Sequence, residues 1–593
     1  MDLKYLLKNI NKPARYTGGE FNTPNLDKPH ALNFCLCFPD IYEVGMSNLG
    51  FKILYHLLNE KIDIVCQRCF APFLDMGKAL EEYALPLFSL EKKQPLNSFD
   101  VLGFSLQYEL SYTTILYMLH LANVPFYSSE RDDTFPLVIG GGPSAFNPEP
   151  VADFFDLLII GEAEEKLLEF LNFYKASKVG NLTKREILKE AANLSGIYVP
   201  SIVKPKYDGS KIKSHSGKVN KCVIKNLDKV YYPTAMLVPN IEIVHDRSIL
   251  ELFRGCYRSC RFCQAGYTGR PIRYKSADTL FEIAKKLTKN TGYDEISLNS
   301  LSTGDYPWLK DLIDKIQKCA DTKNLKMQLP SLRADSYFSE FSSSSRKSSL
   351  TFAPEAGSQR LRNIINKNIT KEDIENCLAA AFRQGFFNIK LYFMIGLPGE
   401  TEDDIHAILD VVKKTKEYYN LYKTSGKQLS ISLTISTFVP KPFTPFQWER
   451  FNSKEEINKK LEILKSGLKQ RNVYFSYNDY YTSKLEVIFS RGDRKLSRVI
   501  ESAFKLGCCF DGSAETFKKE LWEKAFLECN IDDKEYLEQK CVDEILPWDF
   551  INIFVDKEFL ISQKEQSKKE IVGDCKEKCL GCGALKSGRC NNA

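Results

Sequence analysis

Apolar segments of strand length alternate with segments of helical periodicity through the first third of the chain. Apolar runs of five to seven residues predict strands, and a 3.6-residue repeat of apolar positions predicts amphipathic helices. Strands are predicted at 33–38, 62–67, 100–105, 136–140 and 157–161, and helices at 47–59, 72–83, 112–122 and 163–174. Strands separated by helices predict an α/β fold whose first domain is a doubly wound, Rossmann-like parallel sheet.

The alternation pauses in a Lys-, Ser- and Gly-rich stretch and then resumes. The later strands are predicted at 249–253, 295–300, 327–332, 350–355, 388–396 and 430–438, and the helices at 277–289, 308–319, 371–384, 401–419 and 454–470, with a shorter helical piece after Ala334. Six strand–helix units predict a partial (β/α)6 TIM-like barrel, which carries its chemistry at the carboxyl ends of its strands. The predicted organisation is an N-terminal segment (1–30), the first domain (31–175), a connector (176–245), the barrel (246–475) and a cysteine-rich C-terminal extension (476–593).

Composition excludes two classes of protein. The 593 residues are 43% hydrophobic and 27% charged, with a formal net charge of +6, which does not suit a polybasic nucleic-acid binder. No run of about 18 apolar residues occurs, so a membrane protein is not expected. The first 22 residues lack the pattern of a secretory signal, and the predicted location is cytoplasmic.

The 18 cysteines include a compact group directly after the first barrel strand. Cys256, Cys260 and Cys263 have C-x3-C-x2-C spacing, which lets one loop supply three thiolates to a metal centre. Three ligands with one open position suit an iron–sulfur cubane. A structural zinc requires four ligands, and no nearby Cys or His supplies the fourth.

A second group lies in the last 20 residues. Cys575, Cys579, Cys582 and Cys590 are predicted to bind metal, either a structural zinc or an auxiliary iron–sulfur cluster. Spacing alone does not choose between these two.

The first group, its place after the first barrel strand and the aromatic Phe262 beside its last cysteine resemble the radical S-adenosylmethionine (SAM) enzymes. The resemblance implies that Cys256, Cys260 and Cys263 hold a [4Fe–4S] cluster and that SAM binds its open iron. One electron, from a donor such as flavodoxin or ferredoxin, then cleaves SAM to methionine and a 5′-deoxyadenosyl radical. Phe262 is expected near the adenine.

Other strand ends supply candidate SAM contacts. Asn299 and Ser300 stand where the superfamily usually has a Gly-Gly-Glu motif. Arg333 and Glu355 suit the SAM carboxylate and ribose, with a salt bridge between the two as the alternative. Gly396 and Gly399 belong to a Gly-Leu-Pro-Gly-Glu-Thr element similar to one of radical SAM barrels, where the backbone runs beside adenine, although a plain turn and helix cap explains the same residues.

A doubly wound domain before such a barrel resembles the cobalamin-binding radical SAM proteins, and the resemblance extends over nearly the whole chain. Gly140, Gly141 and Gly142 follow a strand where the backbone can approach a ligand. Tyr42 replaces the histidine of the cobalt-binding loop, so cobalamin is bound without a protein ligand or the domain has lost it.

The sequence therefore predicts an enzyme that cleaves SAM reductively and performs a cobalamin-assisted methyl transfer on a substrate that no residue pattern identifies. One alternative is sulfur insertion or methylthiolation of RNA or protein, with the tail cysteines holding a second cluster. A non-catalytic SAM- or RNA-binding module is the other.

Overall fold

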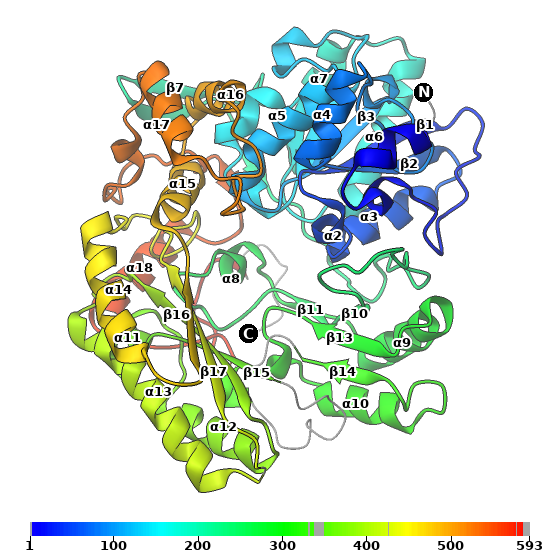
Figure 1. The fold of residues 1–593 in the computed structure, drawn as a ribbon. Coiled ribbons are helices and arrows are strands. Elements are labelled where there is room, and N and C mark those ends of the chain that lie inside the picture. The colour runs from blue at the N-terminus through cyan, green and yellow to red at the C-terminus, as the bar shows by residue number, and fades with distance from the viewer. Residues whose placement is uncertain (1–2, 330–332, 337–348, 425, 577, 585–593) are drawn as a thin grey trace.

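The computed structural model describes residues 3–329, 333–336, 349–424, 426–576 and 578–584 (Figure 1). Its first sheet has the strand order β2-β1-β3-β4-β5-β6, one of the common doubly wound orders for its first five strands. The strands are β1 (Leu32–Phe38), β2 (Ile64–Phe70), β3 (Val101–Ser105), β4 (Leu137–Gly141), β5 (Leu157–Ile159) and β6 (Ile197–Tyr198). All pairings are parallel except that of β6, which extends the sheet past residue 175, the predicted end of the domain.

Helices cover both faces of this sheet because its strands are apolar on both sides. In β1, Cys35 and Cys37 pack into one core and Phe34 and Leu36 into the other. Helices α4 (Leu74–Glu82) and α5 (Tyr112–Leu121) contribute to the first core. Helices α3 (Leu49–Asn59), α6 (Glu164–Val179) and α7 (Lys184–Ala191) contribute to the second.

The second half contains two further parallel sheets rather than one. The first has β10 (Ser248–Glu251), β13 (Glu295–Asn299) and β14 (Lys326–Gln328), and the second has β15 (Leu350–Glu355), β16 (Asn388–Ile395), β17 (Ser430–Thr437) and β18 (Val473–Tyr477). Among the described residues no ladder joins β14 to β15, so the predicted single six-stranded sheet is not seen. The end of the predicted strand 327–332 lies outside the described ranges.

Amphipathic helices cover the outer faces of these two sheets. They are α9 (Ala277–Thr291), α10 (Leu309–Lys318), α12 (Lys371–Arg383), α13 (Glu402–Tyr422) and α14 (Lys454–Leu468). In β16 the apolar positions alternate, with Leu391 and Phe393 buried under the helices and Tyr392 exposed on the opposite face. The prediction of an α/β protein with parallel sheets is confirmed.

The C-terminal extension returns to the N-terminal domain. Its helices are α15 (Tyr480–Arg491), α16 (Leu496–Leu506), α17 (Lys519–Glu528) and α18 (Lys557–Lys568), and all four contribute to the same core as α5. Figure 1 shows the orange α15–α17 beside the blue and cyan N-terminal domain, with the red α18 beside the yellow and green helices below. In the described part of the chain, no helix has both the length and the apolarity needed to cross a membrane.

Candidate active site and metal-binding loops

The first cysteine loop, residues 256–263, lies between the paired strands β11 (Phe253–Arg254) and β12 (Arg273–Tyr274). Burial, reinforced by the neighbouring thiols, raises the pKa of Cys256 to about 11 and that of Cys263 to about 12. The positive charges of Arg333 and Lys367 act in the opposite direction on these two thiols. Because only a thiolate binds a metal, metal binding at this loop must displace protons.

The described cysteines of the two loops do not form a ready-made site for a single metal ion. Among the described residues, no three Cys, His, Asp or Glu side chains are close enough together to hold a single metal ion. A tetrahedral zinc requires such convergence. A [4Fe–4S] cubane does not, because each of its thiolates binds a different iron.

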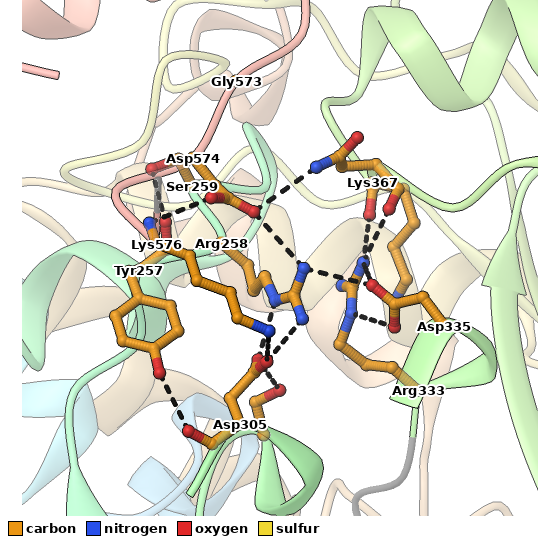
Figure 2. Close-up of polar contacts among 12 residues, drawn as sticks. Tyr257, Arg258, Ser259, Asp305, Arg333, Asp335, Lys367, Gly573, Asp574 and Lys576 are labelled. Carbon is orange, nitrogen blue, oxygen red and sulfur yellow. Dashed lines mark hydrogen bonds and ion pairs between the residues drawn. The ribbon is translucent and has the colours of Figure 1, made fainter. Parts of the chain in front are cut away.

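Arg258, inside the first cysteine loop, is fixed by carboxylates from three distant segments (Figure 2). Its Nε donates to Asp305 at 2.7 Å, and its Nη1 lies 3.1 Å from Asp335 and 3.3 Å from Asp574. The side chain is only 7% exposed. Although burial alone acts upward, hydrogen bonds from Arg258 and Ser302 hold the pKa of Asp305 below its usual range. This ion-pair cluster sets the course of the loop between its first two cysteines.

Arg333 and Glu355 do not pair with each other. Arg333 donates to Asp335 at 3.0 Å and to the carbonyl of Lys367 at 2.6 Å, whereas Glu355 pairs with the Lys367 ammonium at 3.0 Å. Arg333 is 9% exposed and its guanidinium already has these partners, which favours a structural role. Lys367, which sequence reasoning missed, is the cation whose charge reaches Cys263.

The predicted adenine-side residues lie around the end of β16. Phe262 packs against a small core that includes Leu361, Leu397 and Phe438. Gly396 has φ +83° and donates its N–H to Glu400 at 2.7 Å, and Gly399 has φ +73°, so both use conformations that favour glycine. Thr401 and Asp404 form a capping box at the start of α13. The helix cap is therefore observed, and the nucleotide contact stays a prediction.

A cavity of about 720 Å³ lies between the N-terminal domain and the first barrel sheet. Gly140, Gly141 and Gly142 line it at the carboxyl end of β4, and Asn299 lines it at the carboxyl end of β13. Ser300 is not among the lining residues; its hydroxyl lies 3.2 Å from that of Thr303. A Cβ on Gly142 would come within 2.5 Å of the Leu106 carbonyl oxygen, so this turn requires glycine.

Acidic and basic residues join the two domains at the edge of the cavity. Arg254 bonds Glu251 at 2.8 Å and Glu164, at the start of α6, at 2.6 Å. Lys275 bonds Glu251 at 2.6 Å. Burial alone would act upward, yet Arg254 and Lys275 lower the pKa of Glu251 to about 2. These contacts tie the start of the first cysteine loop to the N-terminal domain.

Tyr42 is not among the residues that line this cavity. Its side chain is 2% exposed, and its hydroxyl donates to Glu20 at 2.9 Å. His245, in contrast, lines the barrel side of the cavity. Sequence reasoning missed His245, because none of the six histidines was placed in a metal-ligand spacing.

The tail cysteine loop, residues 575–582, packs behind the first cysteine loop. The Cys575 N–H donates to the Tyr257 carbonyl oxygen at 2.9 Å, and Gly573 exchanges hydrogen bonds with the Asn366 side chain at 2.8 and 2.9 Å. Figure 2 shows Asp574 and Lys576 reaching Arg258 and Asp305. Cys590 lies outside the described residues. Sequence reasoning missed these contacts, because Arg258 and Asp574 are 316 positions apart.

Two family descriptions match this chain. "Radical SAM proteins, N-terminal" matches residues 50–200, and "Radical SAM superfamily" matches residues 250–412, which contain the first cysteine loop. The chain therefore belongs to the radical SAM superfamily and is an enzyme that uses a [4Fe–4S] cluster and SAM.

Among its relatives is an uncharacterized protein of Methanocaldococcus jannaschii, 27% identical over 471 residues that cover 79% of this chain and 90% of that protein. A tRNA-2-methylthio-N(6)-dimethylallyladenosine synthase of Pelagibacter ubique is 24% identical over 280 residues, which are 43% of this chain and 61% of the synthase. Among solved structures, one similar chain is the radical SAM methyltransferase TsrM of Kitasatospora setae, with cobalamin and a [4Fe–4S] cluster bound. The match has a TM-score of 0.46 and 14% sequence identity, and it covers 68% of this chain and 75% of TsrM.

Proposed function

We propose that this enzyme binds cobalamin in the cavity between its two domains and uses it, together with SAM cleavage, to transfer a methyl group. The observation that carries the proposal is the cavity itself, which joins the carboxyl end of the N-terminal sheet to the carboxyl ends of β10 and β13. In open α/β sheets, ligands bind at the carboxyl ends of the strands. A cofactor placed there would face the start of the first cysteine loop.

The lining of the cavity suits the face of a large ring system that also carries an anionic group. Its walls are predominantly apolar, including Leu36, Ile53 and Ile139. The glycine turn 140–142 lets a ring system approach the backbone, and the N-terminus of α3, with Asn48 and Gly50, lines one side. Tyr42 supplies no cobalt ligand because it is hydrogen-bonded to Glu20 away from the cavity. Cobalamin would therefore be held by its edges and its nucleotide tail.

The first cysteine loop is proposed to hold the [4Fe–4S] cluster through Cys256, Cys260 and Cys263. When bound, the cluster and SAM supply the 5′-deoxyadenosyl radical after one electron arrives from a small electron-transfer protein. Asn299, Lys367 and Glu355 lie at or near the strand ends and are the polar groups that would orient SAM. Arg258 and its carboxylates fix the loop in place.

An anaerobic titration with hydroxocobalamin tests the proposal. We expect near-stoichiometric retention after desalting, read from the visible absorption. Gly50→Trp should abolish retention, because a Cβ there has only the Asn48 Oδ1 nearby, at 3.4 Å, and the indole would occupy the cavity. Gly426→Trp, at an exposed glycine with no neighbour within 4 Å, is the matched control. Absence of retention by the unmodified chain would overturn the proposal.

Methylthiolation of RNA is the second candidate, and the similarity to the tRNA-modifying synthase favours it. The two functions differ in the products formed from labelled SAM. A methyl group without additional sulfur in the product supports methyl transfer, and an added methylthio group supports the alternative.

A further inference from the structure

The tail cysteine loop has no part in the proposed methyl transfer, yet it repeats the C-x3-C-x2-C spacing of the first cysteine loop. Cys575, Cys579 and Cys582 follow one another as Cys256, Cys260 and Cys263 do. Two glycines with positive φ, Gly581 at +71° and Gly583 at +99°, turn the chain around the last cysteine. The Gly581 N–H donates to the Cys579 sulfur at 3.4 Å. Backbone N–H groups directed at cysteine sulfurs are typical of iron–sulfur sites, where they tune the reduction potential.

A buried cation without a carboxylate partner lies beside these thiols. Arg270 is 4% exposed, and its charge lies close to the sulfurs of Cys575 and Cys582. Its Nη1 has no hydrogen-bond partner of the N or O type among the described residues. Its Nη2 donates to Ser259 Oγ, in the first cysteine loop, at 2.6 Å. A buried guanidinium requires a compensating negative charge, and metal-bound thiolates beside it would supply one.

We propose that Cys575, Cys579 and Cys582 hold a second iron–sulfur cluster, with Arg270 as its buried counter-ion, directly behind the first cysteine loop. Iron–sulfur is favoured over zinc because the spacing of the three cysteines equals that of the first cysteine loop, in a chain whose superfamily uses a [4Fe–4S] cluster. The inference does not depend on cobalamin or on the substrate.

The test counts metals in the full chain after anaerobic reconstitution with ferrous iron and sulfide. With both loops occupied by [4Fe–4S] clusters, the unmodified chain should bind about eight irons, and with one loop occupied about four. This measurement requires no substitution. Iron and zinc are determined together by mass spectrometry of the desalted protein, and the cluster type by Mössbauer spectroscopy.

Triple variants then show which cysteine loop binds each half of the iron. The triple variant C575S/C579S/C582S should lose about half of the iron, and C256S/C260S/C263S the other half. The matched control C319S/C529S/C541S removes three cysteines outside both loops and should keep all of it. About four irons in the unmodified chain, zinc in the tail, or unchanged iron in the tail variant would overturn the proposal.

Discussion

The two cysteine loops have the same spacing but different surroundings, and the difference separates their roles. The first cysteine loop follows β11 beside the strand ends and the cavity, and the cations near it, Arg333 and Lys367, already have carboxylate partners. The tail cysteine loop packs against the backbone of the first, and its cation, Arg270, has no carboxylate partner among the described residues. Spacing thus predicts metal binding, whereas the neighbours of each loop are the basis of our proposal that the first one faces SAM.

The largest effect is expected from a substitution that disables the first cysteine loop alone. Cys260→Ala removes a proposed cluster ligand and should lower the yield of 5′-deoxyadenosine from SAM by more than about 100-fold, because loss of a ligand costs more than loss of an outer partner. The tail iron should remain. Cys541→Ala, at an exposed cysteine, is the control. An unchanged yield from Cys260→Ala would contradict the assignment of the first cysteine loop to the SAM-binding cluster.

A second prediction concerns the ion pairs of Glu251 and Arg254, which anchor the first cysteine loop to the N-terminal domain. The described part of the tail cysteine loop has no such ion pairs with that domain. Glu251 has a pKa of about 2 in the fold, below its ordinary value of 4.5. A lowered carboxyl pKa stabilises the fold above pH 4.5, and that contribution is lost as the pH falls toward 2. Glu251→Gln should therefore lower the unfolding free energy by about 3 kcal/mol at pH 7.

The measurement is urea unfolding of the metal-free chain at pH 7, 4 and 3. The difference in unfolding free energy between Glu251→Gln and the unmodified protein should become smaller at each lower pH. Glu190→Gln, at an exposed carboxylate, should show little difference at any pH. A difference for Glu251→Gln that does not change with pH would show that the carboxylate acts through its shape and not its charge.

The parts of the molecule with local signals were predictable from sequence. Strands such as β1 and β16 have apolar runs or strict alternation, and the cysteine loops are defined by spacing over eight residues. Strand β18 was missed because its residues are mostly exposed at the edge of a sheet and form no apolar run.

Contacts between distant segments had no local signal. The cavity brings Gly140 of the N-terminal domain to Asn299 of the first barrel sheet. The ion-pair cluster around Arg258 joins Asp305, Asp335 and Asp574 from three separate segments. Such groupings depend on how the domains and the tail pack together. The sequence therefore indicated the cofactors of the superfamily and most of the candidate residues, but not which residues hold the loops in place.

Asp574→Asn tests whether the tail cysteine loop supports the first. The substitution removes one of three carboxylates around a buried guanidinium, so the tail should dock less firmly by about 1–2 kcal/mol. We expect faster proteolytic cleavage of the tail and a several-fold lower rate of SAM cleavage, with the iron of the first cysteine loop retained. Unchanged rates in both assays would mean that the tail contacts the first cysteine loop without stabilising it.

The smallest expected effect comes from the neighbouring ion pair. Lys576 lies 3.4 Å from Asp305, but its side chain is 53% exposed, so water and salt screen the interaction. Lys576→Gln should change the rate of tail proteolysis and of SAM cleavage by less than about twofold, since exposed ion pairs contribute under about 1 kcal/mol. Asp574 and Lys576 lie two positions apart in the same docked segment. Comparing the two variants therefore separates the effect of losing a buried charge from the effect of any substitution in this segment. If Lys576→Gln were as damaging as Asp574→Asn, the packing of the segment as a whole, and not the carboxylate on Arg258, would hold the two cysteine loops together.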